Sequence, residues 1–147
     1  MQKRQTQYGF SFVELLVALA IIAILVTIAV TTYAEYSQRA RVSGGIRLAS
    51  PVKLAVAEYY SSHNEFPASN SAAGIAPPEE IADQDIQSVS IGTAPTTGTV
   101  VIVFNSRGSV AAGDSVLLVP LKYHKTVLWQ CTSKTLINKL LPAACRQ

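Results

Sequence analysis

A single carboxylate lies within an otherwise apolar segment near the N-terminus of this 147-residue chain. Between Phe10 and Val30 the only polar residues are Ser11, Glu14 and Thr27. This segment would be about 31 Å long as a helix, which matches the hydrocarbon core of a bilayer. An unpaired carboxylate in such surroundings is costly, so a carboxylate found there indicates a functional role.

Cleavage of the chain after Gly9 would give Glu14 a local cationic partner. It would create an α-amino group on Phe10, and that group is positively charged at neutral pH. Residues four apart in a helix lie on the same face, as Phe10 and Glu14 would. Gly9 has no side chain, which suits a peptidase that needs access to the backbone. These residues predict a processing site at Gly9–Phe10 and an ionic role for Glu14.

Three alternatives remain for this N-terminal segment on these grounds alone. It could be a signal anchor that stays in the mature protein, a signal peptide cut near Ala34, or a leader cut at Gly9. A secretory signal peptide is expected to end in small residues, whereas residues 31–36 read TTYAEY. The cations on the two sides of the segment predict opposite orientations of the segment across a membrane. They are Lys3 and Arg4 before it, and Arg39, Arg41 and Arg47 after it.

The run Gly9-Phe10-Ser11-Phe12-Val13-Glu14-Leu15 resembles the leader junction of type IV pilins. In that family a prepilin peptidase cuts after the Gly and methylates the new N-terminal Phe. The Glu at the fifth mature position pairs with the N-terminal amine of a neighbouring subunit. The resemblance therefore implies cleavage after Gly9, N-methylation of Phe10 and an assembly role for Glu14.

The first half of the chain predicts one long helix, from Phe10 to about Ser62. Its second half becomes amphipathic, because apolar residues recur there at spacings of three or four. Gly44 and Gly45 weaken the pattern, and Pro51 is expected to kink the helix without ending it. The stripe expected to face a core consists of Val42, Ile46, Ala49, Val52, Val56 and Tyr60.

The second half of the chain predicts a loop followed by four strands. The loop covers residues 63–85 and includes a helix start at residues 77–80. The strand candidates are residues 86–93, 99–105, 116–123 and 126–132, and Pro120 places the third at an edge or a bulge. The order predicts an α+β fold, in which a long N-terminal α-helix packs against a four-stranded antiparallel β-sheet.

Type IV pilins have the same order of elements, followed by a C-terminal loop closed by a disulfide. The resemblance implies three parts for this chain. Residues 1–9 would be a cleaved leader, residues 10–36 a hydrophobic helix for the membrane and the filament core, and residues 37–147 a globular head.

Cys131 and Cys145 bound a segment of 15 residues counting both ends. A disulfide closing it would contribute about 3 kcal/mol of stability. Two free thiols are an alternative, and a metal pair is disfavoured because neither cysteine has a CxxC or nearby His partner. The segment holds Lys134 and Lys139 and no acidic residue. The resemblance implies a disulfide here, and a loop that could contact DNA or an anionic surface.

Composition and motifs exclude several classes of protein. Charged residues make up 14% of the chain and hydrophobic residues 49%, which is incompatible with intrinsic disorder. The net charge of +3 does not indicate nucleic-acid binding by itself. The sequence lacks a P-loop, GxGxxG or HExxH motif, so we predict neither an enzyme nor a cofactor. The acids at 79, 80, 83 and 85 lack the pattern of an EF-hand loop, so no metal site is predicted.

The sequence therefore predicts a structural subunit of a type IV pilus, of the IVa kind. Monomers would reside in the inner membrane and then form a homo-oligomeric helical filament, the extracellular fimbrium, with the help of prepilin peptidase and the pilus assembly machinery. The family implies adhesion, twitching motility or DNA uptake as uses. A minor pilin or a type II secretion pseudopilin is an alternative. A signal-anchored periplasmic binding domain is another.

Overall fold

The computed structural model of this chain describes residues 9–124 and 126–146. Residues 1–8 of the predicted leader, with Lys3 and Arg4, therefore lie outside the described residues. The chain divides into two units between Tyr36 and Ser37. We call the second unit, from Ser37 onward, the head.

Two consecutive α-helices occupy the region predicted as one helix. Helix α1 covers Phe12–Leu48 and α2 covers Ser50–His63. The interruption falls at Ala49, and Pro51 lies in the first turn of α2. Pro51 has no N–H, so it cannot donate a helix hydrogen bond to the carbonyl oxygen four residues earlier. The ladder continues on both sides, since Ala49 N–H donates to Gly45 O and Lys53 N–H donates to Ala49 O, both at 3.0 Å.

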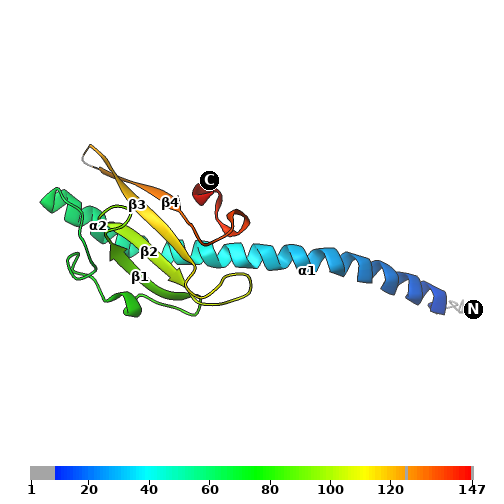
Figure 1. Cartoon of the computed structure of the whole chain (residues 1–147). Coiled ribbons are helices and arrows are strands. Elements are labelled where there is room, and N and C mark those ends of the chain that lie inside the picture. Colours follow the sequence, from blue (N-terminus) through cyan, green and yellow to red (C-terminus); the bar gives the residue numbers. More distant parts are fainter. Residues whose placement is uncertain (1–8, 125, 147) are drawn as a thin grey trace, which may run out of the picture. The chain divides into compact units, whose positions relative to one another are not determined.

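Four antiparallel strands follow in the order β1-β2-β3-β4 (Figure 1). They are β1 (Ile86–Gly92), β2 (Thr99–Phe104), β3 (Ser115–Tyr123) and β4 (Thr126–Thr132). The four predicted strands are confirmed, each to within one residue at either end. They were recognisable because β-branched residues fill them and turn residues separate them.

Pro120 lies in β3, which is an internal strand of the sheet. The pairing of β2 with β3 ends at Leu118, and beyond it β3 pairs only with β4, where Pro120 is opposite Trp129. Pro120 therefore lies where β3 is locally an edge, which is the environment that tolerates a residue without an N–H.

The loop between α2 and β1 is held by a buried asparagine that the sequence pattern did not single out. Asn70 is 4% exposed. Its Nδ2 donates to Ala76 O at 2.9 Å and Val89 O at 3.1 Å, and its Oδ1 accepts from Ile91 N–H at 2.7 Å. These bonds satisfy backbone groups on the open edge of β1. The helix start expected in this loop is a single 3-10 turn, η1 (Pro78–Glu80).

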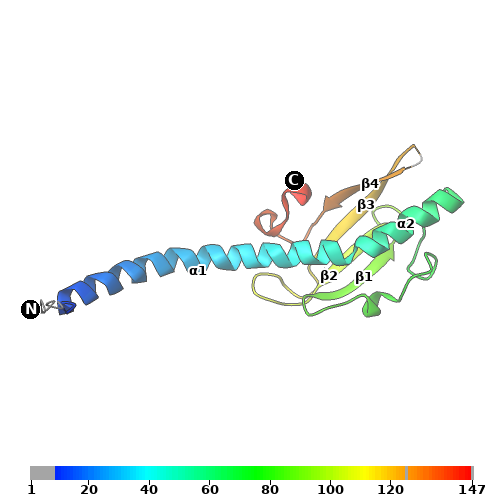
Figure 2. The ribbon, with the colours of Figure 1, turned by 180° about the vertical axis from the view of Figure 1, so that it is seen from behind.

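One face of the sheet packs on the amphipathic part of the helices, and Figure 2 shows α2 lying across that face. Of the predicted stripe, Ile46 is only partly buried, and Gly45 is buried beside it. A Cβ at Gly45 would lie 2.6 Å from Ile86 Cδ1 and 3.0 Å from Phe104 Cε1. Gly45, which weakened the predicted pattern, is therefore the residue that lets α1 approach β1 and β2. The rest of the stripe is buried: Val42, Ala49, Val52, Val56 and Tyr60.

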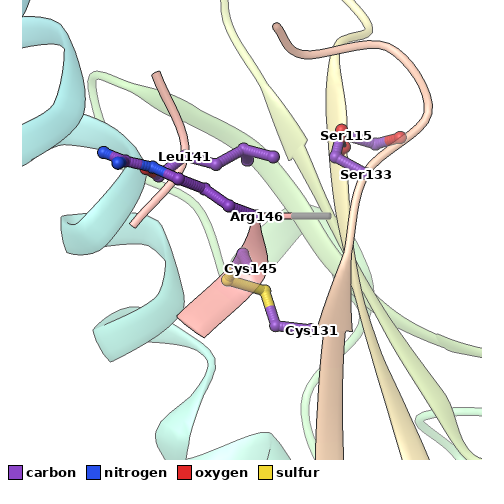
Figure 3. The surroundings of a disulfide bond; sticks show 6 residues. All are labelled: Ser115, Cys131, Ser133, Leu141, Cys145 and Arg146. Carbon is purple, nitrogen blue, oxygen red and sulfur yellow. Dashed lines mark hydrogen bonds between the residues drawn. A yellow bond between two sulfur atoms is a disulfide. The ribbon is translucent and has the colours of Figure 1, made fainter. Parts of the chain in front are cut away.

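The C-terminal segment after β4 returns to the sheet and is closed by a disulfide (Figure 3). Cys131 of β4 is bonded to Cys145 in the 3-10 turn η3 (Ala143–Cys145). Ser133 Oγ donates to Ser115 O at 2.6 Å, so the segment is also tied to β3. Together with the helix and the sheet, this disulfide loop confirms the predicted fold class.

We predict that Gly45→Val lowers the free energy of unfolding of the head by about 1–3 kcal/mol, because the added methyl groups overpack against Ile86 and Phe104. Gly44→Val is the matched control, since a Cβ there meets nothing within 4 Å. Chemical unfolding of the purified chain in detergent would measure both. Equal effects of the two substitutions would contradict the close-approach role of Gly45.

Replacing both Cys131 and Cys145 by Ala should lower the free energy of unfolding by about 3 kcal/mol, because the unfolded chain gains the entropy of an open 15-residue loop. Thermal unfolding with and without reductant gives the control. Reductant should lower the melting temperature of the wild type to that of the double variant and leave the variant unchanged. A variant as stable as the oxidised wild type would contradict this account.

Candidate functional site

Glu14 lies in the first turn of α1, where the structure gives its carboxylate a backbone partner. Ser11 N–H donates to Glu14 Oε2 at 3.4 Å, and Leu15 N–H donates to Ser11 O at 3.2 Å. Ser11 directly precedes the first helical residue, Phe12, so Glu14 occupies the acidic position of a capping box. A negative charge here also interacts favourably with the positive end of the helix dipole.

The predicted cleavage junction lies just before this helix start. Gly9 and Phe10 are exposed and outside regular structure, and a Cβ added at Gly9 would meet nothing within 4 Å. Phe10 is 84% exposed. An exposed junction outside regular structure is compatible with cleavage by a peptidase. Three of the predicted site residues, Gly9, Phe10 and Glu14, are thus close along the chain and lie at one helix end.

The apolar segment presents its side chains outward all round. From Phe10 to Val30 the large apolar residues keep 49–84% of their surface exposed. The hydroxyl of Thr27 donates to Ile24 O at 2.7 Å, so this polar group is satisfied within the helix. The described residues contain one helical stretch whose length and composition would allow it to cross a membrane. Such a surface needs lipid or other apolar helices around it.

The C-terminal segment from residue 132 to residue 146 forms a basic edge of the head. Lys134 and Arg146 are exposed, as is Ile137 between them. Arg39 of α1 donates from Nε and Nη2 to Lys139 O, at 3.2 and 3.0 Å, and so holds this segment on the helix. The predicted pair Cys131 and Cys145 is brought together at its base.

Two of the acids considered for a metal site have structural roles instead. Asp85 Oδ1 lies 3.0 Å from Arg107 Nη1 and 3.9 Å from Arg41 Nε. Asp83 Oδ1 accepts from the N–H groups of Asp85 and Ile86, both at 2.8 Å. In the part of the chain that the structure describes, His, Cys, Asp and Glu form no group of three or more suited to hold a metal ion.

Two family profiles match this chain. The profile for pilin, a bacterial filament protein, matches residues 38–146, and the profile for the prokaryotic N-terminal methylation motif matches residues 4–30. The first therefore covers the head, and the second covers the predicted cleavage junction and the apolar segment.

Named relatives from two genera resemble the chain over most of its length. The fimbrial protein EcpC of Eikenella corrodens is 35% identical over 97% of this chain and 93% of its own length. The type IV major pilin protein PilE1 of Neisseria gonorrhoeae is 31% identical over 95% and 94%. A fimbrial protein of Neisseria meningitidis serogroup A is 34% identical over 85% and 72%.

The family assignment thus rests on both ends of the chain and on the fold between them. An apolar helix beginning with a methylation motif continues into a head built from an antiparallel sheet and a disulfide-closed segment. The chain belongs to the type IV pilins and is a structural subunit of a pilus rather than an enzyme.

Proposed function

We propose that residues 1–9 are a leader removed by prepilin peptidase, which then methylates Phe10. The observation that carries this proposal is the match to the N-terminal methylation motif over residues 4–30, together with the exposed junction at Gly9. Residues 10–36 would hold the precursor in the inner membrane and later form the filament core, and residues 37–147 would form the head exposed on the extracellular pilus.

The apolar surface of α1 explains how one helix serves in both places. The side chains exposed from Phe10 to Val30 can be covered by lipid before assembly and by neighbouring helices afterwards. Among the described residues, the carboxylate of Glu14 accepts only the long hydrogen bond from Ser11 N–H, which lies just before its helix. The methylated amine of a neighbouring subunit would give it a charged partner, and charge-assisted bonds are the stronger ones. Docking would therefore favour the filament.

We also propose that this chain is a major pilin, because relatives in two genera bear the names fimbrial protein and type IV major pilin. Surface adhesion and twitching motility are the uses that follow most directly from such a filament. The exposed Lys134 and Arg146 supply positive charge for contact with DNA or an anionic surface. These cations act as a sequence-independent electrostatic site.

Intact mass spectrometry of protein sheared from the cell surface tests processing and export together. The expected mass is that of residues 10–147, increased by one methyl group and decreased by the two hydrogens lost in the disulfide. A chain found only in membranes and retaining Met1 would refute both cleavage and pilus assembly. Deletion of the prepilin peptidase should give that unprocessed form and serves as the control.

Glu14→Ala should leave the membrane pool intact and reduce sheared filaments by about tenfold or more, a factor that corresponds to ~1.4 kcal/mol. Glu14→Gln separates the two roles of the side chain. It keeps an acceptor for Ser11 N–H but removes the charge, so it should fail to the same degree. Normal filaments from the Ala variant would refute an assembly role, and normal filaments from Gln alone would assign that role to helix capping.

A further inference from the structure

An apolar pocket of about 400 Å³ lies on the head between the helices and the loop that precedes β1. Leu48 and Pro51 form its helix side, and Ile75 and Ile81 form its loop side. Three of these side chains, Leu48, Ile75 and Ile81, are partly buried against the core. The pocket therefore has walls of apolar side chains that are fixed from behind. We call it the loop pocket.

The rim of the loop pocket is acidic. Glu80 lines it, and Glu79 is adjacent in the turn η1. Both side chains are exposed, and among the described residues neither forms an ion pair. An occupant that combines an apolar side chain with nearby positive charge would match both features of this pocket.

The shape of the pocket does not depend on an occupant. Asn70 O accepts from Ile75 N–H at 3.1 Å, and Pro78 O accepts from Ile81 N–H at 3.3 Å. Asn70 is itself tied to β1 through Val89 O at 3.1 Å. Binding to a preformed site avoids the entropic cost of ordering a loop.

The head carries a protruding side chain that fits this description. Ile137 is 56% exposed, although its neighbour Leu136 is 6% exposed and Leu140 only 1%. Leu140 N–H donates to Ile137 O at 3.0 Å, so the turn around Ile137 is closed. Its buried neighbours anchor the segment, which fixes Ile137 in an outward position. Lys134 lies three residues before it and Lys139 two residues after it.

A surplus of positive charge distinguishes the segment of Ile137 from the surroundings of Leu54, an exposed apolar residue of α2. Leu54 is 60% exposed, and both Lys53 and Glu58 lie near it in the sequence, so their charges offset each other. The segment of Ile137 holds Lys134, Lys139 and Arg146 and no acidic residue. Charge complementarity therefore selects this segment for the acidic rim of the loop pocket.

The two surfaces cannot meet within one head. The C-terminal segment and the turn η1 lie on opposite edges of the head in Figures 1 and 2. A helical filament needs two different, complementary patches on every subunit, because its contacts are head-to-tail. A second copy of the chain is therefore the occupant that these surfaces fit.

We propose that Ile137 of one subunit inserts into the loop pocket of a neighbouring subunit, with Lys134 facing the carboxylates of Glu79 and Glu80. This contact rests on the proposed filament assembly and adds to it a specific junction between heads. It would set the register between neighbouring heads, which the apolar helices alone specify weakly because their surfaces are uniformly apolar.

Cross-linking within sheared filaments tests the proposal. Both native cysteines are joined in the disulfide, so only the introduced thiols are free to react with a short bismaleimide. Ile137→Cys combined with Ile81→Cys should give covalent oligomers at about tenfold or more the yield of a matched control, a factor corresponding to ~1.4 kcal/mol. The control is Leu128→Cys with Ile81→Cys, because Leu128 is 50% exposed on β4. Detergent-dispersed monomers should show no such oligomers.

A charge-reversal pair provides a second, independent measurement. Lys134→Glu should reduce filament yield, and Glu80→Lys in the same chain should restore it. If the cysteine variants do not form filaments, the charge-reversal pair serves as the test of the head contact. Two outcomes would overturn the head contact but not the proposed function. One is intact filaments that cross-link no more than the control. The other is a Lys134→Glu variant whose filament yield is not restored by Glu80→Lys. Absence of filaments from the wild type would instead overturn the proposed function.

Discussion

The exposed apolar surface of the first half of α1 is the constraint on which the behaviour of this chain depends. Large side chains from Phe10 to Val30 have no partner within the described residues that removes them from solvent. Their burial contributes roughly 25 cal/mol per Å² of apolar surface removed from water. A bilayer or a bundle of like helices supplies that burial, and transfer between them exchanges one apolar environment for another. Because that exchange alone favours neither environment strongly, the proposed pairing of Glu14 would favour the filament.

The head depends on a change of pattern within the same helical region. After Ser37, apolar residues recur in a stripe, and the sheet covers it closely because Gly45 leaves room for Ile86 and Phe104. A helix that is apolar all round would offer the sheet no preferred face. The change from a uniform surface to a stripe thus separates the part with an exposed apolar surface from the part that folds around its own core.

β-branched content and turn residues were sufficient to predict the four strands, and a period of three to four predicted the buried stripe apart from Ile46, since burial on one helix face imposes that period. They could not predict Asn70, because a single polar residue in a loop shows no periodicity and two of its three hydrogen bonds join it to backbone groups of β1, about 20 residues away in the sequence. Gly45 was misjudged for a related reason: helix propensity disfavours glycine, and only the position of β1 and β2 shows why it is needed. The pairing of Glu14 with an amine needs a second subunit and remains a prediction.

Two irregular segments of the head, the loop before β1 and the C-terminal segment, share one physical feature: each is fixed by bonds that are not part of a helix or sheet ladder. Asn70 holds the loop before β1, whereas Arg39 and the disulfide hold the C-terminal segment. Helices and strands pair their backbone groups with one another, so their edges have a shape that depends little on the sequence. Irregular segments offer such shape but bind weakly if they must be ordered first. Fixing both in advance would resolve this conflict for the proposed contact between heads, which needs two different and complementary surfaces on every subunit.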